Sequence, residues 1–210
     1  MIVGAVCEAR VRNNRRMIVV ILVTGMTYLA AGADEPRPPK ELEKLWSNLG
    51  TDDPAKARQA ITALVAKPDT VVPFFQKRLR PVPRPGPSRL ARLIADLDND
   101  RFKVRESATQ ELEQVGELAE AALRKALTGQ PPPEVRRRID RVLLANKRQR
   151  LHPPPDQLRL ERAVEVLEQI GDRAARQLLA TLARGAPEAP LTRDAEGALQ
   201  RLVERPAASP

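Results

Sequence analysis

A run of cations between residues 134 and 150 is the densest group of side chains in this sequence that could bind a charged partner. Its cations are Arg136, Arg137, Arg138, Arg141, Lys147, Arg148 and Arg150, and its acids are Glu134 and Asp140. On a helix with its apolar row at 135, 139, 142 and 143, the first four arginines spread over the exposed side. Such a face meets a phosphate backbone or an anionic membrane, or it is a solvated surface whose aliphatic stems cover the core edge. We expect the solvated surface, and we take Arg136, Arg137, Arg138 and Arg141 as the candidate partner-binding residues.

Residues for catalysis or metal binding are scarce, because the chain holds one Cys and one His. This scarcity excludes a Cys/His zinc site, a Cys–His nucleophile pair and a disulfide framework. His152 stands before two prolines, and we expect it on a surface loop. The sequence therefore predicts a protein that is not an enzyme, with no catalytic residue, no metal, no cofactor and no small-molecule substrate.

Three aspartates at alternate positions, Asp96, Asp98 and Asp100, resemble the first ligands of a calcium loop. Such a loop needs Gly at its sixth position and Glu at its twelfth, where this chain has Arg101 and Ser107. We expect instead a helix end, a turn and an N-cap at Asp100. The glutamates at 111, 113, 117 and 120 belong to helix faces, and we expect them on a solvated surface.

Aromatic residues make up 2% of the chain. This low content argues against a β-sandwich or barrel, and it removes the stacking groups on which single-strand nucleic-acid binders depend. Trp46 lies on an apolar helical row and is expected in the core. Phe74 and Phe75 are adjacent, so one of them is expected to face outward, where it could anchor a partner.

Helical periodicity recurs from residue 42 to residue 202, with apolar residues three and four positions apart. Prolines cluster between these segments, and no alternation of period two persists. With 42% hydrophobic and 30% charged residues, the chain is neither disordered nor a membrane bundle. We therefore predict an all-α fold. Asp53 and Ser88 are predicted to cap helix starts, and Gly116 and Gly171 to end helices in a left-handed conformation.

The N-terminal 33 residues have the layout of a secretory signal. Four arginines precede an apolar run over residues 17–33, and the composition then changes sharply at Asp34. The tripeptide at 31–33 fits the small-residue exit of such signals, so cleavage is predicted after Ala33. The alternative is an uncleaved anchor, in which case the membrane would be met through residues 17–33. The protein is thus expected to be exported, periplasmic or extracellular, or anchored by its N-terminus.

Composition divides the chain into five segments. A signal peptide or anchor is predicted for residues 1–33, N-terminal helices for 34–79 and a Pro-rich linker for 80–87. Helical repeats are predicted for 88–205, and a disordered tail for 206–210. Four prolines over residues 81–87 make the linker extended and semi-rigid.

An internal repeat with an offset of 55 joins the segment at 108–127 to the segment at 163–182. Residues 112–116 read LEQVG and residues 167–171 read LEQIG, and the alanines and leucines on both sides keep the same offset. Helix pairs of this kind bury their apolar faces by stacking side by side. The pattern over 100–127, from Asp100 through Val104, Arg105 and Gly116 to Leu127, resembles a HEAT repeat. The region 45–202 also resembles a helical module that follows WD-repeat β-propellers in some bacterial proteins.

The resemblance implies a short HEAT-like α-solenoid of antiparallel helix pairs that binds other macromolecules without catalysis. We therefore expect an exported scaffold or protein-interaction module, which binds an unidentified protein partner on the row of second helices. The alternative is a cytoplasmic nucleic-acid-associated protein that uses the basic helix at 134–150, in keeping with the net charge of +9. An exported protein meets little nucleic acid, so we do not expect that partner.

Overall fold

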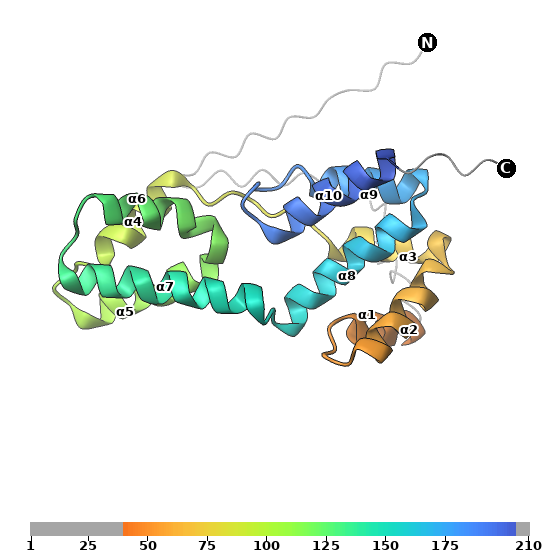
Figure 1. Ribbon diagram of the computed structural model, residues 1–210, viewed down its shortest axis with the longest axis horizontal. Coiled ribbons are helices and arrows are strands. Elements are labelled where there is room, and N and C mark those ends of the chain that lie inside the picture. The colour runs from red at the N-terminus through yellow and green to blue at the C-terminus, as the bar shows by residue number, and fades with distance from the viewer. Residues whose placement is uncertain (1–39, 205–210) are drawn as a thin grey trace, which may run out of the picture. The chain divides into compact units, whose positions relative to one another are not determined.

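The computed structural model describes residues 40–204, and within them every regular element is a helix (Figure 1). The α-helices are α1 (Lys40–Leu49), α2 (Pro54–Val65), α3 (Pro68–Arg78), α4 (Pro87–Asp96), α5 (Phe102–Val115), α6 (Glu120–Thr128), α7 (Pro133–Leu151), α8 (Pro155–Ile170), α9 (Arg173–Leu182) and α10 (Pro190–Glu204). A 3₁₀ turn, η1 (Gly116–Ala119), joins α5 to α6. The all-α prediction is confirmed. The predicted signal segment 1–33 and the tail 206–210 lie outside the described residues.

Most of the described helices begin at a proline, and few begin at a residue whose side chain caps the helix. Six helices begin at a proline (α2, α3, α4, α7, α8 and α10), the position where a missing N–H costs nothing. Asp53 caps α2 as predicted, by accepting from the N–H groups of Ala55 and Lys56. These two backbone bonds lower the pKa of its carboxyl. The predicted cap at Ser88 is wrong, because Gly86 holds the capping position and Pro87 is the first helical residue.

The predicted N-cap at Asp100 is also wrong. The chain enters α5 one residue later, with Arg101 at the capping position and the side chain of Asn99 accepting from the Arg101 N–H. Gly171 ends α8 in the predicted left-handed conformation, with φ 61° and ψ 6°. Gly116 also has a positive φ, 64°, but its ψ of −135° leads into η1 instead of a left-handed cap.

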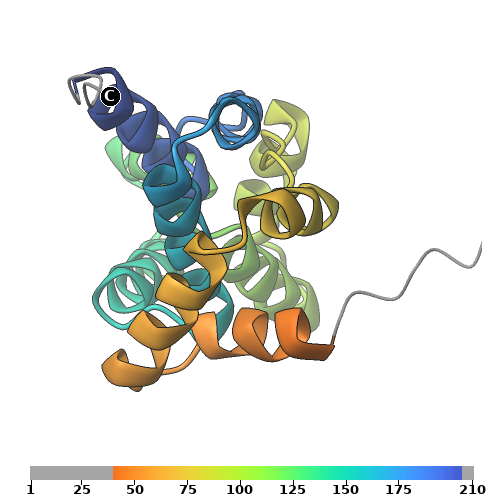
Figure 2. The same cartoon turned by 90° about the vertical axis from the view of Figure 1, so that its right-hand side faces the viewer.

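Two hydrophobic cores organise the described residues. The first is built by α1–α3 together with α8–α10, and its fully buried members include Leu64, Phe75 and Leu167. The second is built by α4–α7 with η1, around Leu112, Leu123 and residues of α7. Figure 2 shows the N-terminal helices α1–α3 beside the C-terminal helices. The composition-based segments 34–79 and 88–205 do not follow these cores, since both segments contribute helices to the first one.

The segment between α3 and α4 runs without helix and is held by the loop between α9 and α10. The Ala186 N–H donates to the carbonyl of Val82 over 2.8 Å. Gly185 lies so close to Val82 that a Cβ on it would stand 2.9 Å from the Val82 nitrogen and 3.1 Å from its oxygen. The same Cβ would overlap Oγ1 of the buried Thr192. We call this contact the linker clasp: Val82, Gly185, Ala186 and Thr192.

Two arginines of α8 close the C-terminal end of α1. Arg162 donates from Nη1 to the carbonyls of Leu49 and Thr51, each over 2.6 Å. Arg159 donates from Nε to the carbonyl of Trp46 over 3.2 Å. Helix ends leave carbonyls without intrahelical partners, so these guanidinium groups satisfy acceptors that burial would otherwise leave orphaned. The bonds tie the first described helix to α8, more than a hundred residues later in the chain.

Three aromatic residues, Trp46, Phe74 and Phe75, form one cluster in the first core. The rings of Trp46 and Phe75 have centroids 5.4 Å apart, and those of Trp46 and Phe74 6.1 Å apart. The expectation that one phenylalanine faces outward is wrong, because Phe74 is 6% exposed and Phe75 fully buried. The guanidinium of Arg78 lies 3.7 Å from the Phe74 ring centroid and covers it, while also pairing with Glu43.

Candidate interaction surfaces of helices α4–α7

The basic helix is α7, and its inner face packs into the second core. Val135, Ile139 and Val142 are buried and Leu143 is partly buried, as the apolar row predicts. Two polar residues share this inner face. Asn146 is 1% exposed, and its side-chain amide has no hydrogen-bond partner among the described residues. The second is Arg138.

Arg138 lies inside the fold, and its predicted place on the exposed side is wrong. It is 8% exposed. Nε donates to Glu134 over 2.9 Å, and Nη1 donates to Glu106 over 3.1 Å and to the hydroxyl of Thr109 over 3.2 Å. A buried guanidinium needs this number of acceptors, because an unpaired buried charge is strongly destabilising. Arg138 is therefore a structural link between α5 and α7 and is not available to a partner.

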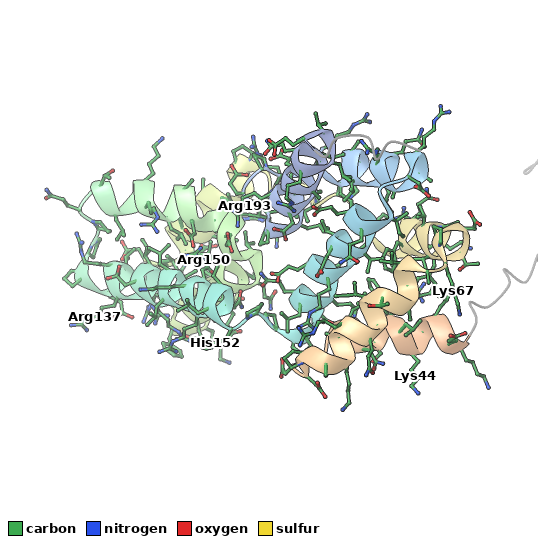
Figure 3. The ribbon with its side chains drawn as sticks, turned by 45° about the vertical axis from the view of Figure 1, so that its right-hand side comes forward. Lys44, Lys67, Arg137, Arg150, His152 and Arg193 are labelled. Atoms are coloured by element: carbon green, nitrogen blue, oxygen red, sulfur yellow. The ribbon has the colours of Figure 1, made fainter. Side chains whose placement is uncertain are left out.

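Other arginines of α7 are neutralised by glutamates of neighbouring elements. Arg141 lies 3.4 Å from Glu106 and 3.2 Å from Glu113. Arg150 binds Glu120, and the hydrogen bond to that carboxylate raises the pKa of Arg150. The glutamates expected on a solvated surface thus act in part as acid partners for α7. Glu117, whose side chain is 14% exposed, pairs with Arg193 over 2.7 Å and with Arg150 over 3.8 Å; both arginines are labelled in Figure 3.

The outward face of α7 keeps a different set of residues. Arg137, Leu144, Arg148 and Leu151 are exposed and follow one another at intervals of seven, four and three positions. These intervals place them within about 60° of one another around the helix axis. We call these four residues the outer stripe. Arg136 and Lys147 flank it, and Figure 3 shows Arg137 near the N-terminal end of α7.

The cations of this face have no acidic partner within residues 40–204. Arg136, Arg137, Lys147 and Arg148 make no ion pair there, and Asp140 is the one acid on the same side. Of the four predicted partner-binding residues, Arg136 and Arg137 are thus exposed and unpaired. Arg141 is exposed but paired, and Arg138 is buried. Sequence analysis missed Leu144 and Leu151. Their positions lie outside the buried apolar row of the helix, and this was the signal that could have identified them as exposed.

A groove lies between α4 and α6, with a volume of about 570 Å³. Its apolar residues are Leu90 and Ile94 from α4 and Leu118 from η1, with alanines from both helices along its walls. Lys125 lies in the wall and makes no ion pair with any described residue. Arg84, at the linker end, pairs with Glu188 over 3.4 Å. Figure 1 shows α4 and α6 in one layer, with α5 and α7 in the other.

The lining of a smaller pocket of about 270 Å³ includes three carboxylates, those of Glu117, Glu161 and Asp194. Desolvation, together with repulsion from Glu161, raises the pKa of Asp194. No group of three or more potential metal ligands forms among residues 40–204. His152 follows the last residue of α7 and is exposed. It belongs to no group of three potential metal ligands among the described residues.

One aromatic side chain of the described region is strongly exposed, and sequence reasoning did not single it out. Phe102 begins α5 and is 61% exposed. The guanidinium carbons of Arg105 and Arg138 each lie 5.8 Å from its ring centroid. The signal available in the sequence was its position outside the apolar row that begins at Val104.

Within residues 40–204, none of the helices combines the length and the apolar character that crossing a membrane requires. Comparison with known proteins adds no relative to this description: no family model, no curated protein and no solved structure matches the chain.

Proposed function

We propose that this protein is an exported, non-catalytic helical scaffold that binds a protein partner in the groove between α4 and α6. The observation that carries the proposal is the groove itself. Its volume and apolar lining fall in the range of binding sites with a few polar groups to set orientation. It lies between two helices, a geometry that accepts the apolar face of a partner helix.

The wall composition indicates the kind of partner. Small residues along both helices, among them Ala91, Ala122 and Ala126, let a third helix approach closely. Lys125 offers a cation without an internal acid, so an amphipathic helix with a carboxylate beside its apolar face fits best. The repeat supports a solenoid of HEAT-like antiparallel pairs, in which α6 is the second helix of its pair. Equivalent positions 55 residues apart, Leu112 and Leu167, are both fully buried.

Export is supported by the sequence of the first 33 residues, in which arginines precede an apolar run that ends in small residues at 31–33. Expression in a bacterial host, followed by fractionation and intact mass, tests it. Loss of mass equal to residues 1–33, with the protein in the soluble extracytoplasmic fraction, is the expected result. Full-length protein in the cytoplasm would overturn the export part of the proposal.

Partner binding is tested with photo-crosslinking residues placed in the native host at exposed groove positions, Ala91 and Ala121, and at the exposed control position Ala55 on α2. We expect a discrete adduct from the groove positions and none from the control. Binding of the captured partner should then be lost in Ala121→Arg and kept in Ala55→Arg. Adducts that are equal at all three positions, or equal loss in both arginine variants, would refute a groove-specific partner.

A further inference from the structure

The outer stripe of α7 is an exposed surface of the described residues that the proposed function leaves unexplained. Its leucines are well exposed, Leu144 at 48% and Leu151 at 65%. Both point away from the core, since the buried residues Ile139 and Val142 occupy the opposite side of the helix. Two exposed leucines on a helix that already buries a full apolar row add nothing to the fold. Their exposed side chains are available for burial in an apolar environment.

The charge around the leucines is positive and is not compensated inside the described region. Arg137 and Arg148 lie within the stripe, and Arg136 and Lys147 lie on its flank. By contrast, the arginines on the inner and lateral sides of α7 each have a glutamate partner. The fold thus pairs the buried Arg138 and the lateral Arg141 and Arg150 with glutamates, and it leaves the cations around the stripe without an acid among residues 40–204. The stripe presents apolar side chains between unpaired cations.

This arrangement fits an anionic bilayer surface better than the other partners of a basic helix. A partner helix would be held by apolar anchors at positions i, i+3, i+4 and i+7, whereas the i+3 and i+4 positions between these leucines are Lys147 and Arg148. Nucleic acids are held by phosphate pairing and base stacking, which do not use leucines. At a bilayer, leucines enter the boundary between headgroups and acyl chains, and the long cationic side chains reach the phosphates.

We infer that α7 lays its outer stripe against anionic phospholipid, as a peripheral contact driven mainly by charge. The inference goes beyond the proposed function and does not require a partner in the groove. Since the surrounding cations lie at the membrane surface, salt weakens the contact. The exposed leucines reach the boundary between headgroups and acyl chains.

The test uses the full chain with Cys7→Ser and an environment-sensitive fluorophore on one introduced cysteine. The label replaces Lys147, beside the stripe, or Val203 on α10, which is 81% exposed. Vesicles of phosphatidylcholine are compared with vesicles that also contain phosphatidylglycerol, at low and high salt. We expect a blue shift at position 147 with the anionic vesicles at low salt, and no such shift at position 203. Insertion of residues 17–33 alone would occur with both vesicle types.

Two matched charge reversals complete the test. Arg137→Glu with Arg148→Glu should weaken vesicle binding by at least about 25-fold, since each cation near an anionic surface contributes about fivefold. Arg58→Glu with Arg173→Glu changes the net charge equally on α2 and α9, and should stay within about twofold of the parent. Circular dichroism confirms folding of both. Equal losses in the two pairs, or equal shifts at both label positions, would overturn the inference. A fluorescence shift at position 147 with a polyglutamate peptide, and none with anionic vesicles, would overturn the inference and indicate an acidic protein as the partner of the stripe.

Discussion

Replacement of Gly185 by alanine probes the linker clasp. The substitution adds a single methyl group, but its carbon would stand 2.9 Å from the backbone nitrogen of Val82 and would overlap the hydroxyl of Thr192. Backbone atoms cannot move aside as the end of a long side chain can. The chain must therefore part the loop between α9 and α10 from the segment before α4.

The cost follows from two losses. Overpacking of a tight site typically costs about 1–3 kcal/mol. Parting the segments also breaks the bond from the Ala186 N–H to the Val82 carbonyl, which contributes about 0.5–1.5 kcal/mol. We therefore expect a loss of about 2–4 kcal/mol in the free energy of unfolding. At about 2–4 °C per kcal/mol for a chain of this size, Tm should fall by about 5–12 °C.

The assay is thermal and urea unfolding followed by circular dichroism, with Gly197→Ala as the matched control. Gly197 lies within α10, and a Cβ there meets only the guanidinium end of Arg201, at 3.2 Å. Alanine should stabilise that site by about 0.5–1 kcal/mol, because it restricts the unfolded chain and favours helix. Equal effects of the two substitutions, or an unchanged Tm for Gly185→Ala, would refute the close approach. Faster hydrogen exchange at the Ala186 amide should accompany the loss.

Three further substitutions test contacts described above. Arg138→Met should lower the free energy of unfolding by about 2 kcal/mol, because it leaves acceptors on α5 without their donor. The control Arg137→Met should change that free energy by less than about 0.5 kcal/mol. Similar values for the two variants in urea titrations would contradict the buried network of Arg138. Arg162→Met removes the donor to two carbonyls at the end of α1 and should cost about 1–3 kcal/mol in the same titration, and a neutral result would mean that water replaces it. Asp194→Asn should raise Tm at neutral pH. The pKa of Asp194 is raised in the native state, so the native state binds the proton more tightly than the unfolded chain does. The stability of the parent therefore falls as pH rises through that raised pKa, and asparagine avoids this loss. This gain should vanish below the ordinary aspartate pKa near 3.8, and a gain that persists there would point to another cause.

The sequence predicted local structure well because each helix carries its own apolar period. The buried row of α7, the cap at Asp53 and the left-handed Gly171 follow from residues a few positions apart. None of these features requires knowledge of a distant segment.

Contacts between distant segments account for what the sequence did not predict. Arg138 looks exposed on a helical wheel, and only Glu106 and Thr109 of another helix make its burial possible. Phe74 is buried in a cluster with Trp46 of another helix, and the centroids of the two rings lie 6.1 Å apart. Arg159 stands 55 residues after Val104, at the position where the first repeat has an apolar residue. Its guanidinium donates to the carbonyl of Trp46.

The candidate surfaces were predicted in part. The basic character of the α7 face was readable, and so were two of its exposed arginines. The groove was not readable, since it depends on how α4 and α6 lie beside each other. Exposed leucines were overlooked because periodicity directs attention to apolar residues that share a row.

The division of the first core between both ends of the chain has a consequence for protein synthesis. A ribosome makes α1–α3 first, but the helices that cover their apolar faces, α8–α10, emerge only with the last part of the chain. The second core, α4–α7, is contiguous and can form as soon as Leu151 has left the exit tunnel. During the interval the nascent chain displays the faces of α1–α3 unprotected. A holding chaperone, or a translocation channel that keeps the chain extended, would find its substrate at this stage.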